Sequence, residues 1–287
     1  MRKPIVALVY DFDGTLSPGN MQEFGFIQAV GTTPEQFWDM SNQLAVREDA
    51  SNVLSYMKMM YDEAHSKGIS LRSESFREFG KDVVLFEGVR EWFKLINDYG
   101  RSQGVKVEHY INSSGLKEIV EGTPIAKEFR YIFAGSFIYD ENGEAVWPGI
   151  AVDSTNKTQF LFKINKGIFS ARDNKLVNES IAEDKKRVPF THMVYFGDGD
   201  TDVPCMKIVE MFGGHSIAVY NPEDSRKKKS AFKLKKQGRV SFALPADYSK
   251  GSETFEVIKA IIDKICADYS LQTLSAANTG AKKAKRK

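Results

Sequence analysis

Leu8-Val9-Tyr10-Asp11-Phe12-Asp13-Gly14-Thr15-Leu16 is the stretch that decides the fold. The residues from Ile5 to Val9 are apolar and rich in β-branched types, a pattern that predicts a fully buried strand. In open parallel α/β sheets, reactive groups collect at the carboxyl ends of strands, so we expect Asp11 and Asp13 to lie in a crevice there, with Gly14 letting the backbone turn. Taken alone, the stretch leaves open a simpler alternative, an Asp-rich turn in which Asp13-Gly14 closes a β-hairpin.

Length and composition predict a globular chain with one large core and a smaller accessory domain. The 287 residues exceed the roughly 100 to 200 of a usual single domain. No apolar run approaches the ~20 residues of a membrane span, so we expect a soluble protein with no membrane partner. The run after Arg2 and Lys3 is too short for a signal peptide, and two cysteines, Cys205 and Cys266, fit a reducing compartment. These features predict a cytoplasmic location.

The positive charge is concentrated at the C-terminus. The last six residues carry five Lys or Arg side chains, and subtracting them from the net charge of +2 leaves −3 on residues 1–281. Nucleic-acid-binding domains need a basic face, so a nucleic-acid partner is not expected for the folded body. Residues 276–287 are small and basic, and we expect them to be disordered.

Residues 18–87 have a helical pattern. Thr33-Pro34-Glu35-Gln36 is typical of a helix start, with Thr33 as N-cap and Gln36 closing a capping box. A second amphipathic helix should run from Val53 to Ala64 and end near Gly68, and a later one from Val89 to Tyr99 should stop at Gly100.

Strands alternate with helices in the rest of the chain, which predicts a doubly wound, mainly parallel α/β sheet. Asn142-Gly143 lies between two short apolar runs and predicts a β-hairpin inserted into this pattern. We therefore expect a Rossmann-like core of residues 1–17 and 88–275, and a helical cap of residues 18–87. The expected strands after the first are Val105–Ile111, Tyr131–Ala134, His192–Phe196, Ser216–Val219 and Val240–Ala243.

Three strand ends carry polar groups: Asp11 with Asp13, Ser113 with Ser114, and Asp198 with Asp202. A parallel sheet brings these ends into one crevice, where several carboxylates repel one another by about 4 kcal/mol per pair at ~4 Å and an effective dielectric of ~20. A positive group must therefore be present.

Mg²⁺ is the cation that this pattern favours. Oxygen ligands without a Cys or His cluster select a hard cation, and Mg²⁺ is the one that partners phosphate. The four histidines, His65, His109, His192 and His215, have no metal-ligand spacing and are interpreted as structural. Lys157, at the start of a helix running to about Asn165, is a candidate for a second positive group, although Lys163 and Lys166 lie nearby.

These residues resemble, in order and spacing, the four motifs of the haloacid-dehalogenase-like hydrolase superfamily. The motifs are Asp11-Phe12-Asp13-Gly14-Thr15, Ser113, Lys157 and Gly197-Asp198-Gly199-Asp200-Thr201-Asp202. The resemblance covers residues 5–269 and is greatest to the phosphoserine-phosphatase-like branch, in which a helical cap follows the first motif. Two positions depart from that branch: Ser114 stands where glycine is usual, and Thr201 where asparagine is common. These departures leave the identity of the substrate open.

The resemblance implies a role for each motif. Asp11 would attack phosphorus and form an aspartyl-phosphate, and Asp13 would protonate the leaving oxygen and then activate water. Ser113, with the backbone after it at Ser114, and Lys157 would hold the phosphoryl group. The Mg²⁺ ligands would be the Asp11 carboxylate, the Asp13 carbonyl and Asp198, with Asp202 acting mainly from the outer shell.

The sequence therefore predicts a Mg²⁺-dependent phosphatase that acts on a small-molecule phosphate ester, as a monomer or homodimer. Asp13 argues against a dehalogenase, because carbon–halogen cleavage needs no proton donor. A phosphotransferase or phosphomutase with the same motifs stays open. A non-catalytic protein that binds nucleic acid through its basic tail is less favoured, because Asp11, Asp13 and Asp198 are all retained.

Two further features are interpreted as exposed to solvent. Glu23 falls where the phosphoserine-phosphatase-like branch places a substrate-facing acid, but we favour a solvated residue in the first turn of a helix. The basic run at residues 226–236 is likewise interpreted as an exposed helix face.

Overall fold

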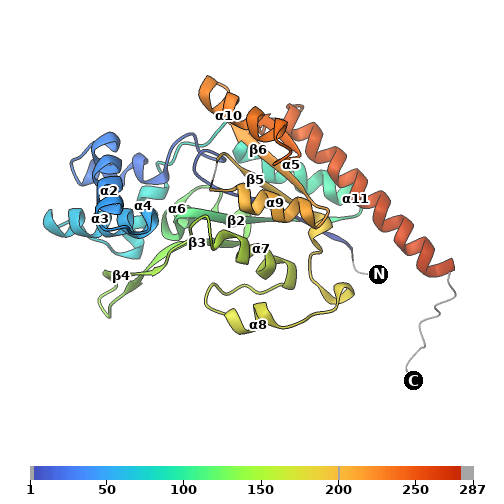
Figure 1. Cartoon of the computed structure of the whole chain (residues 1–287), viewed down its shortest axis with the longest axis horizontal. Helices are drawn as coiled ribbons and strands as arrows, with labels where there is room; N and C mark the ends of the chain where they lie inside the picture. Colours follow the sequence, from blue (N-terminus) through green and yellow to red (C-terminus); the bar gives the residue numbers. More distant parts are fainter. Residues whose placement is uncertain (1–2, 200, 279–287) are drawn as a thin grey trace.

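The computed structural model describes residues 3–199 and 201–278, and its centre is one seven-stranded sheet (Figure 1). The strand order is β4-β3-β2-β1-β5-β6-β7, and every neighbouring pair is parallel except β3 with β4. β1 is the central strand, and all six of its residues are buried. The strands are β1 Ile5–Tyr10, β2 Lys106–Leu116, β3 Phe129–Tyr139, β4 Ala145–Ile150, β5 Met193–Gly197, β6 His215–Tyr220 and β7 Phe242–Pro245.

Helices cover both faces of the sheet, which confirms the doubly wound α/β fold. Alternate residues of β1 face opposite sides: Leu8 joins the apolar cluster that contains α5 and α11, and Val9 joins the cluster that contains α7, α9 and α10. These helices are α5 Val89–Ser102, α7 Lys157–Lys166, α9 Val203–Met211, α10 Ser225–Lys236 and α11 Glu253–Asn278. The short helices α6 Lys117–Gly122 and α8 Asn174–Asn178 and the 3-10 turns Ala126–Glu128, Glu183–Lys185 and Phe190–His192 complete this part.

The strand order reverses at the centre of the sheet. β1 is followed in space by β2 on one side and by β5 on the other, so the chain order runs outward both ways from the β1–β5 pair. Such a switch point leaves a crevice at the carboxyl ends of the strands, because the connections leave in opposite directions. Asp11 and Asp13 follow β1 and Asp198 follows β5, so the fold brings these acids to that crevice.

The segment 18–87 forms helices that lie at one end of the sheet (Figure 1). They are the 3-10 turn Met21–Phe24, α1 Phe26–Ala29, α2 Pro34–Arg47, α3 Asn52–Ser66 and α4 Ser73–Gly80. The Thr33 hydroxyl accepts the Gln36 amide, as expected for the N-cap of α2, whereas the Gln36 side chain accepts the Thr32 hydroxyl instead of closing the capping box. Gly68 has a φ of +64° after the end of α3.

The β3–β4 hairpin ties this helical segment to the sheet. The hairpin that Asn142-Gly143 predicted is present, with Ile138 opposite Trp147, but its loop spans five residues, 140–144. The Glu144 carboxylate accepts from the Ser70 hydroxyl, the Leu71 amide and Arg72 Nε, and Leu71 O accepts the Ala145 amide. The hairpin therefore contacts the connection that leads into α4.

Several expected boundaries are wrong. Gly100 does not end α5, because the helix continues to Ser102 and Gly104 provides the left-handed turn, with a φ of +80°. Gly100 is instead a packing residue, since a Cβ there would lie 2.5 Å from Val107 Cγ2. β2 continues past Ile111 to Leu116, and the last strand lies at Phe242–Pro245, not at Val240–Ala243.

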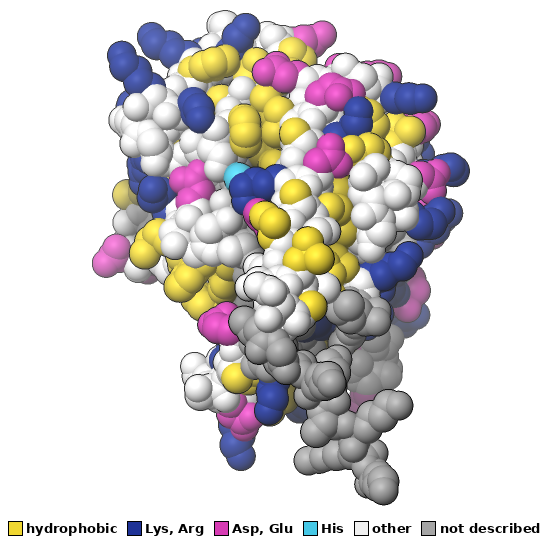
Figure 2. Space-filling view, turned by 90° about the vertical axis from the view of Figure 1, so that its right-hand side faces the viewer, with side chains coloured by type: hydrophobic (Ala, Val, Ile, Leu, Met, Phe, Trp, Pro, Cys, Tyr) yellow, Lys and Arg dark blue, Asp and Glu magenta, His cyan; other side chains and the backbone are white. Residues whose placement is uncertain are grey.

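The C-terminal helix extends further than expected. α11 ends at Asn278, not near Tyr269, so residues 276–278 are helical and not disordered; the rest of the expected tail, 279–287, lies outside the described residues. Over the described part of the chain, every helix is too short or too polar to cross a membrane. Figure 2, which views the molecule from the α11 side, shows basic and acidic side chains interspersed with apolar ones over the described residues of that face.

Candidate active site

The turn after β1 places Asp11 and Asp13 in the crevice and excludes the hairpin alternative. Asp11 is 6% exposed, and its amide donates to Phe196 O on β5 at 2.9 Å. Gly14 follows with a φ of +74°, and a Cβ there would lie 2.4 Å from Asp198 Oδ2. Glycine is therefore required twice over, by the left-handed backbone and by the close approach of the β5 end.

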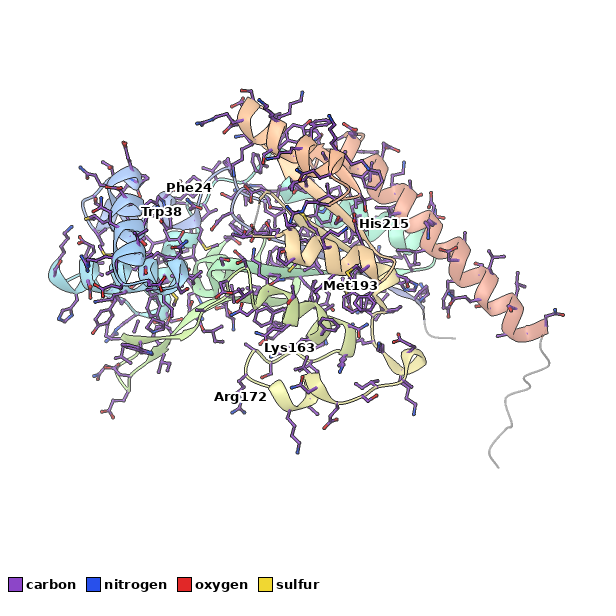
Figure 3. All side chains as sticks on the ribbon, viewed as in Figure 1. Phe24, Trp38, Lys163, Arg172, Met193 and His215 are labelled. Carbon is purple, nitrogen blue, oxygen red and sulfur yellow. The ribbon has the colours of Figure 1, made fainter. Side chains whose placement is uncertain are left out.

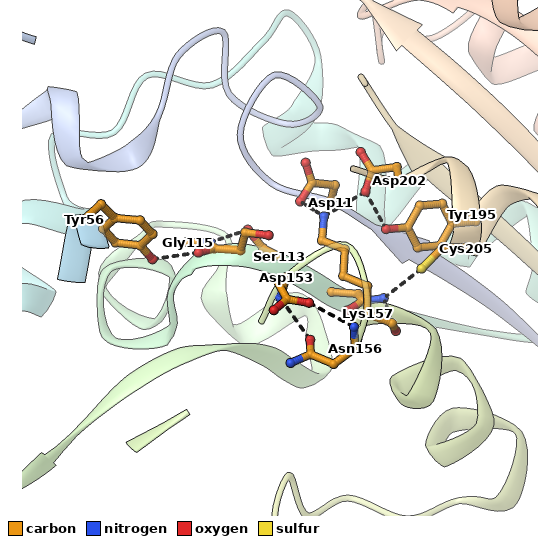
Figure 4. Close-up of polar contacts among 12 residues, drawn as sticks. Asp11, Tyr56, Ser113, Gly115, Asp153, Asn156, Lys157, Tyr195, Asp202 and Cys205 are labelled. Atoms are coloured by element: carbon orange, nitrogen blue, oxygen red, sulfur yellow. Dashed lines mark hydrogen bonds and ion pairs between the residues drawn. The ribbon is translucent and has the colours of Figure 1, made fainter. Parts of the chain in front are cut away.

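Lys157 brings two of the acids together (Figure 4). Its Nζ donates to Asp11 Oδ1 at 2.9 Å and to Asp202 Oδ1 at 2.7 Å, and its side chain is 1% exposed. The other two candidate lysines point elsewhere: Lys163 Nζ donates to Ser170 O, and Lys166 Nζ donates to Val177 O and Glu179 O. Figure 3 shows Lys163 on the side of α7 that faces the segment around Arg172, away from the crevice.

Asp202 stands directly before α9 and is fully buried. The Tyr195 hydroxyl on β5 donates to its Oδ1 at 2.7 Å, while its Oδ2 is buried without a hydrogen-bond partner among the described residues. Asp11, Asp198 and Asp202 each offer one carboxylate oxygen within 4.8 Å of the others. Asp200 of the same motif lies outside the described residues.

The negative charge in this cluster exceeds the positive charge beside it, and the pKa values of the acids reflect this. Burial, followed by the Asp202 charge, raises the pKa of Asp11 to about 7, although Lys157 works in the opposite direction. Burial and the neighbouring Asp11 also raise the pKa of Asp13 well above its ordinary value. Burial opposes the charge of Lys157, but Asp11 and Asp202 outweigh burial and raise its pKa.

The carboxylate geometry fits a hard cation. Three oxygens from three strand and helix ends converge, and one buried oxygen, Asp202 Oδ2, has no donor in the described structure. An unpartnered buried carboxylate oxygen costs free energy unless a positive group reaches it. Oxygen-only donors of this kind suit a hard divalent cation better than a softer metal.

The serine motif lies across the crevice on β2. Ser113 is buried, and its Oγ accepts the Gly115 amide at 3.1 Å. The Tyr56 hydroxyl on α3 donates to Ser114 O at 2.6 Å, and the Met21 amide donates to Asp13 Oδ1 at 2.9 Å. The helical segment thus contacts both the serine motif and the second aspartate.

A cavity of about 820 Å³ opens in front of these groups. Glu23 lines it and is half-buried, with Oε1 accepting from Trp38 Nε1 at 2.7 Å and from Asn20 Nδ2 at 2.7 Å. Figure 3 labels Trp38 and Phe24, which both belong to the helical segment. Glu23 lies in the first turn of a 3-10 helix, as expected, but neighbouring side chains hold its carboxylate at the cavity wall.

The basic helix has an exposed face, as expected, but its first turn also reaches the cavity. Lys227, in the first turn of α10, donates Nζ to Asp198 Oδ2 at 2.6 Å, and Arg226 lines the cavity. Sequence reasoning missed Lys227 because 29 residues separate it from Asp198. It also missed Tyr195, which reads as an ordinary strand aromatic. The available signal for Lys227 was the helix start at Asp224, whose carboxylate accepts the Arg226 and Lys227 amides.

Comparison with known proteins identifies the family. The family model described as haloacid dehalogenase-like hydrolase matches residues 8–207, which include Asp11, Asp13, Asp198 and Asp202. The chain belongs to the haloacid dehalogenase-like hydrolases. The resemblance inferred from the sequence motifs is thus confirmed, and so is the expectation that the protein is a hydrolase.

Relatives of this haloacid dehalogenase-like hydrolase agree with the fold. An uncharacterised protein of Borreliella burgdorferi is 28% identical over 293 residues, covering 92% of this chain and 98% of the relative. A phosphoserine phosphatase captured with an analogue of its phospho-aspartyl intermediate has a TM-score of 0.54 at 17% identity, over 90% of this chain and 99% of that one. A probable phosphoserine phosphatase from Vibrio cholerae has a TM-score of 0.57 at 13% identity, over 94% of this chain and 67% of that one.

Proposed function

We propose that this hydrolase is a Mg²⁺-dependent phosphatase that cleaves a small-molecule phosphomonoester through an aspartyl-phosphate. The observation that carries the proposal is the placement of Asp11: a buried carboxylate at a strand end, held on one side by Lys157, with Asp13 two residues further along the same turn. A carboxylate nucleophile divides one difficult displacement into two easier ones.

Lys157 orients the nucleophile. Its Nζ holds Asp11 Oδ1, which leaves Asp11 Oδ2 as the oxygen that attacks phosphorus. Asp202 holds the other side of Lys157, and Tyr195 in turn holds Asp202. This chain of contacts fixes the carboxylate before substrate arrives, so little reorganisation is needed at the moment of reaction.

Asp13 is suited to proton transfer. Its pKa is raised by burial and by Asp11, which favours the protonated form that the leaving oxygen needs. The Met21 amide fixes its Oδ1, which leaves Oδ2 for the substrate. After the leaving group departs, the deprotonated Asp13 can take a proton from the water that attacks the aspartyl-phosphate.

Asp11, Asp198 and the Asp13 backbone carbonyl would hold Mg²⁺, with Asp202 beside them. When bound, Mg²⁺ supplies positive charge that reduces repulsion between the anionic nucleophile and the anionic phosphate. Ser113 and the backbone that follows it at Ser114 would hold the phosphoryl oxygens on the opposite side.

The segment 18–87 would act as a cap that selects the leaving group. Glu23 offers a carboxylate at the cavity wall, with Oε1 fixed by Trp38 and Asn20 and Oε2 not so constrained. A leaving group with a cationic substituent would complement it. The volume of about 820 Å³ suits a small metabolite ester better than a macromolecular phosphate.

The test is hydrolysis of p-nitrophenyl phosphate by the full chain, with Mg²⁺ and with excess EDTA. We expect turnover to fall by more than about 100-fold in EDTA, because a divalent charge contributes several kcal/mol at such a site, and to recover when Mg²⁺ is restored. Undiminished turnover in EDTA would contradict the proposal.

The role of Asp13 has its own test in Asp13→Asn. Turnover should fall much more on alkyl phosphates than on p-nitrophenyl phosphate, because only a poor leaving group requires protonation. Equal losses on the two substrate types would reject the acid–base role.

A further inference from the structure

Lys227 is held at the active site by α10, although α10 belongs to none of the motifs. Asp224 caps the helix by accepting the Arg226 and Lys227 amides, which directs the first turn toward the crevice. From there Lys227 Nζ donates to Asp198 Oδ2 at 2.6 Å. The Asp198 side chain is 14% exposed and the Lys227 side chain is 50% exposed, so the lysine spans from solvent to the carboxylate cluster.

The Asp198 carboxylate therefore takes part in two arrangements. It belongs to the cluster of three carboxylates, and it also pairs with Lys227. A divalent cation that enters the cluster competes with Lys227 for Asp198, because two positive charges on one carboxylate repel each other.

The Lys227 side chain also borders the space where a substrate would bind. It lines the same cavity as Ser113 and Lys157, where an anionic substrate would lie. Its long, flexible side chain is half exposed, so it can turn between the carboxylate and the cavity without moving α10.

We propose that Lys227 couples cation binding to substrate binding by moving from Asp198 to an oxygen of the substrate phosphate. The inference rests on the proposed function, in which this site takes Mg²⁺ and a phosphate ester. Mg²⁺ at Asp198 displaces Lys227 toward the anion, and an anion that draws Lys227 away leaves Asp198 to the cation. By linkage, each ligand must raise the affinity for the other by the same factor.

A fixed Asp198–Lys227 pair that merely anchors α10 is the competing explanation. It makes a different prediction for the affinity of Mg²⁺ alone. If Lys227 competes with the cation, its removal tightens Mg²⁺ binding; if it only anchors the helix, its removal leaves Mg²⁺ binding unchanged or weaker.

The experiment is calorimetric titration of the full chain with Mg²⁺ alone and with Mg²⁺ in the presence of orthophosphate. The variant is Lys227→Met, the rescue variant is Lys227→Arg, and the matched control is Lys229→Met, two residues along α10 and outside the cavity lining. Thermal unfolding of each variant checks that α10 remains folded.

We expect Lys227→Met to bind Mg²⁺ alone roughly two- to fivefold more tightly than wild type, the range for a partly exposed ion pair. The same variant should lose at least about half of the factor by which orthophosphate raises the Mg²⁺ affinity. Lys227→Arg should retain most of that factor, because the charge is kept, and Lys229→Met should match wild type in both titrations.

Unchanged or weaker Mg²⁺ binding by a folded Lys227→Met protein, with the orthophosphate effect intact, would overturn the inference and leave the proposed function standing. Failure of the proposed function looks different, because wild type itself would then bind no Mg²⁺ and show no EDTA-sensitive hydrolysis.

Discussion

Two buried charge clusters, one around Glu108 on β2 and one at the carboxyl ends of β1 and β5, differ in how their carboxylates are paired. Glu108 on β2 has donors on both oxygens: Oε1 accepts from Lys106 Nζ and Arg187 Nη2 at 2.7 Å, and Oε2 accepts from the Tyr110 hydroxyl and Arg187 Nη1 at 2.6 Å. Asp202, at the carboxyl end of the sheet, shares its lysine with Asp11, and no residue in the described part of the chain donates to its Oδ2.

The pKa values separate the two clusters. Burial opposes the Glu108 charge, but hydrogen bonds from Arg187, Lys106 and Tyr110 outweigh burial and lower the pKa to about 2. At Asp11, burial and Asp202 prevail over Lys157 and raise the pKa to about 7. A carboxylate with donors on both oxygens stabilises the fold, whereas a cluster with surplus carboxylates retains the capacity to bind a cation and to react.

Of all the substitutions, Asp11→Asn should cause the largest loss of turnover, and it should not lower the free energy of unfolding. Loss of the nucleophile should reduce turnover by at least about 10³-fold, because the Asn amide cannot form an acyl phosphate and Asp13 is assigned to proton transfer. The free energy of unfolding should stay equal or rise, since a surplus buried charge is removed. Steady-state kinetics and urea unfolding measure the two quantities, with Asp62→Asn, an exposed ion-pair partner, as the matched control. A large loss of stability in Asp11→Asn would contradict the proposed difference between the two clusters.

Glu108→Gln should have the reverse effect. Removing one partner of a buried pair leaves Arg187 uncompensated, so the free energy of unfolding should fall by about 2–4 kcal/mol. Turnover per folded molecule should be unchanged, because the pair lies far along β2 from the serine motif. Glu48→Gln, from an exposed pair with Arg47, should change stability by less than about 1 kcal/mol. If turnover of the folded Glu108→Gln protein collapsed, the cluster would have to be reassigned to the catalytic machinery.

The pH dependence of stability should have opposite signs for the two clusters in EDTA. Glu108 has a folded pKa below its ordinary 4.5, so its stabilisation is full above pH 4.5 and is lost as the pH falls through about 2. Asp11 has a folded pKa above its ordinary 3.8, so the folded chain retains a proton, and this contribution is full below pH 3.8 and is lost as the pH rises through about 7.

Urea unfolding at several pH values tests these signs. The stability advantage of Asp11→Asn over wild type should grow between pH 5 and 7, by at most about 1.4 kcal/mol per pH unit. The advantage of wild type over Glu108→Gln should shrink below pH 4.5. Parallel curves for wild type and Asp11→Asn would show that the acids of the crevice do not share a surplus charge.

The sequence was sufficient to place reactive residues that directly follow a strand. Asp11 and Asp13 could be placed because a buried strand that ends in carboxylates has one favourable position in a parallel sheet. The helix start at Lys157 could be located as well, and it is Lys157, not Lys163 or Lys166, that reaches Asp11.

Contacts that depend on tertiary packing could not be predicted. Lys227 lies in a run of basic residues whose usual position is solvent, and only the fold brings the start of α10 to Asp198. Arg187 lies in a polar segment without periodicity, yet it carries the bidentate contact with Glu108. Gly100 reads as a helix stop, but the approach of β2 makes it a packing residue within α5.

The most direct test of the central claim is to trap the covalent intermediate. The full chain is mixed briefly with Mg²⁺ and a phosphate ester, quenched in acid, digested and examined by mass spectrometry. We predict one added phosphoryl group on the peptide that contains Asp11, absent in EDTA and in Asp11→Asn. Turnover without any label, or a label on Ser113 in place of Asp11, would contradict the account.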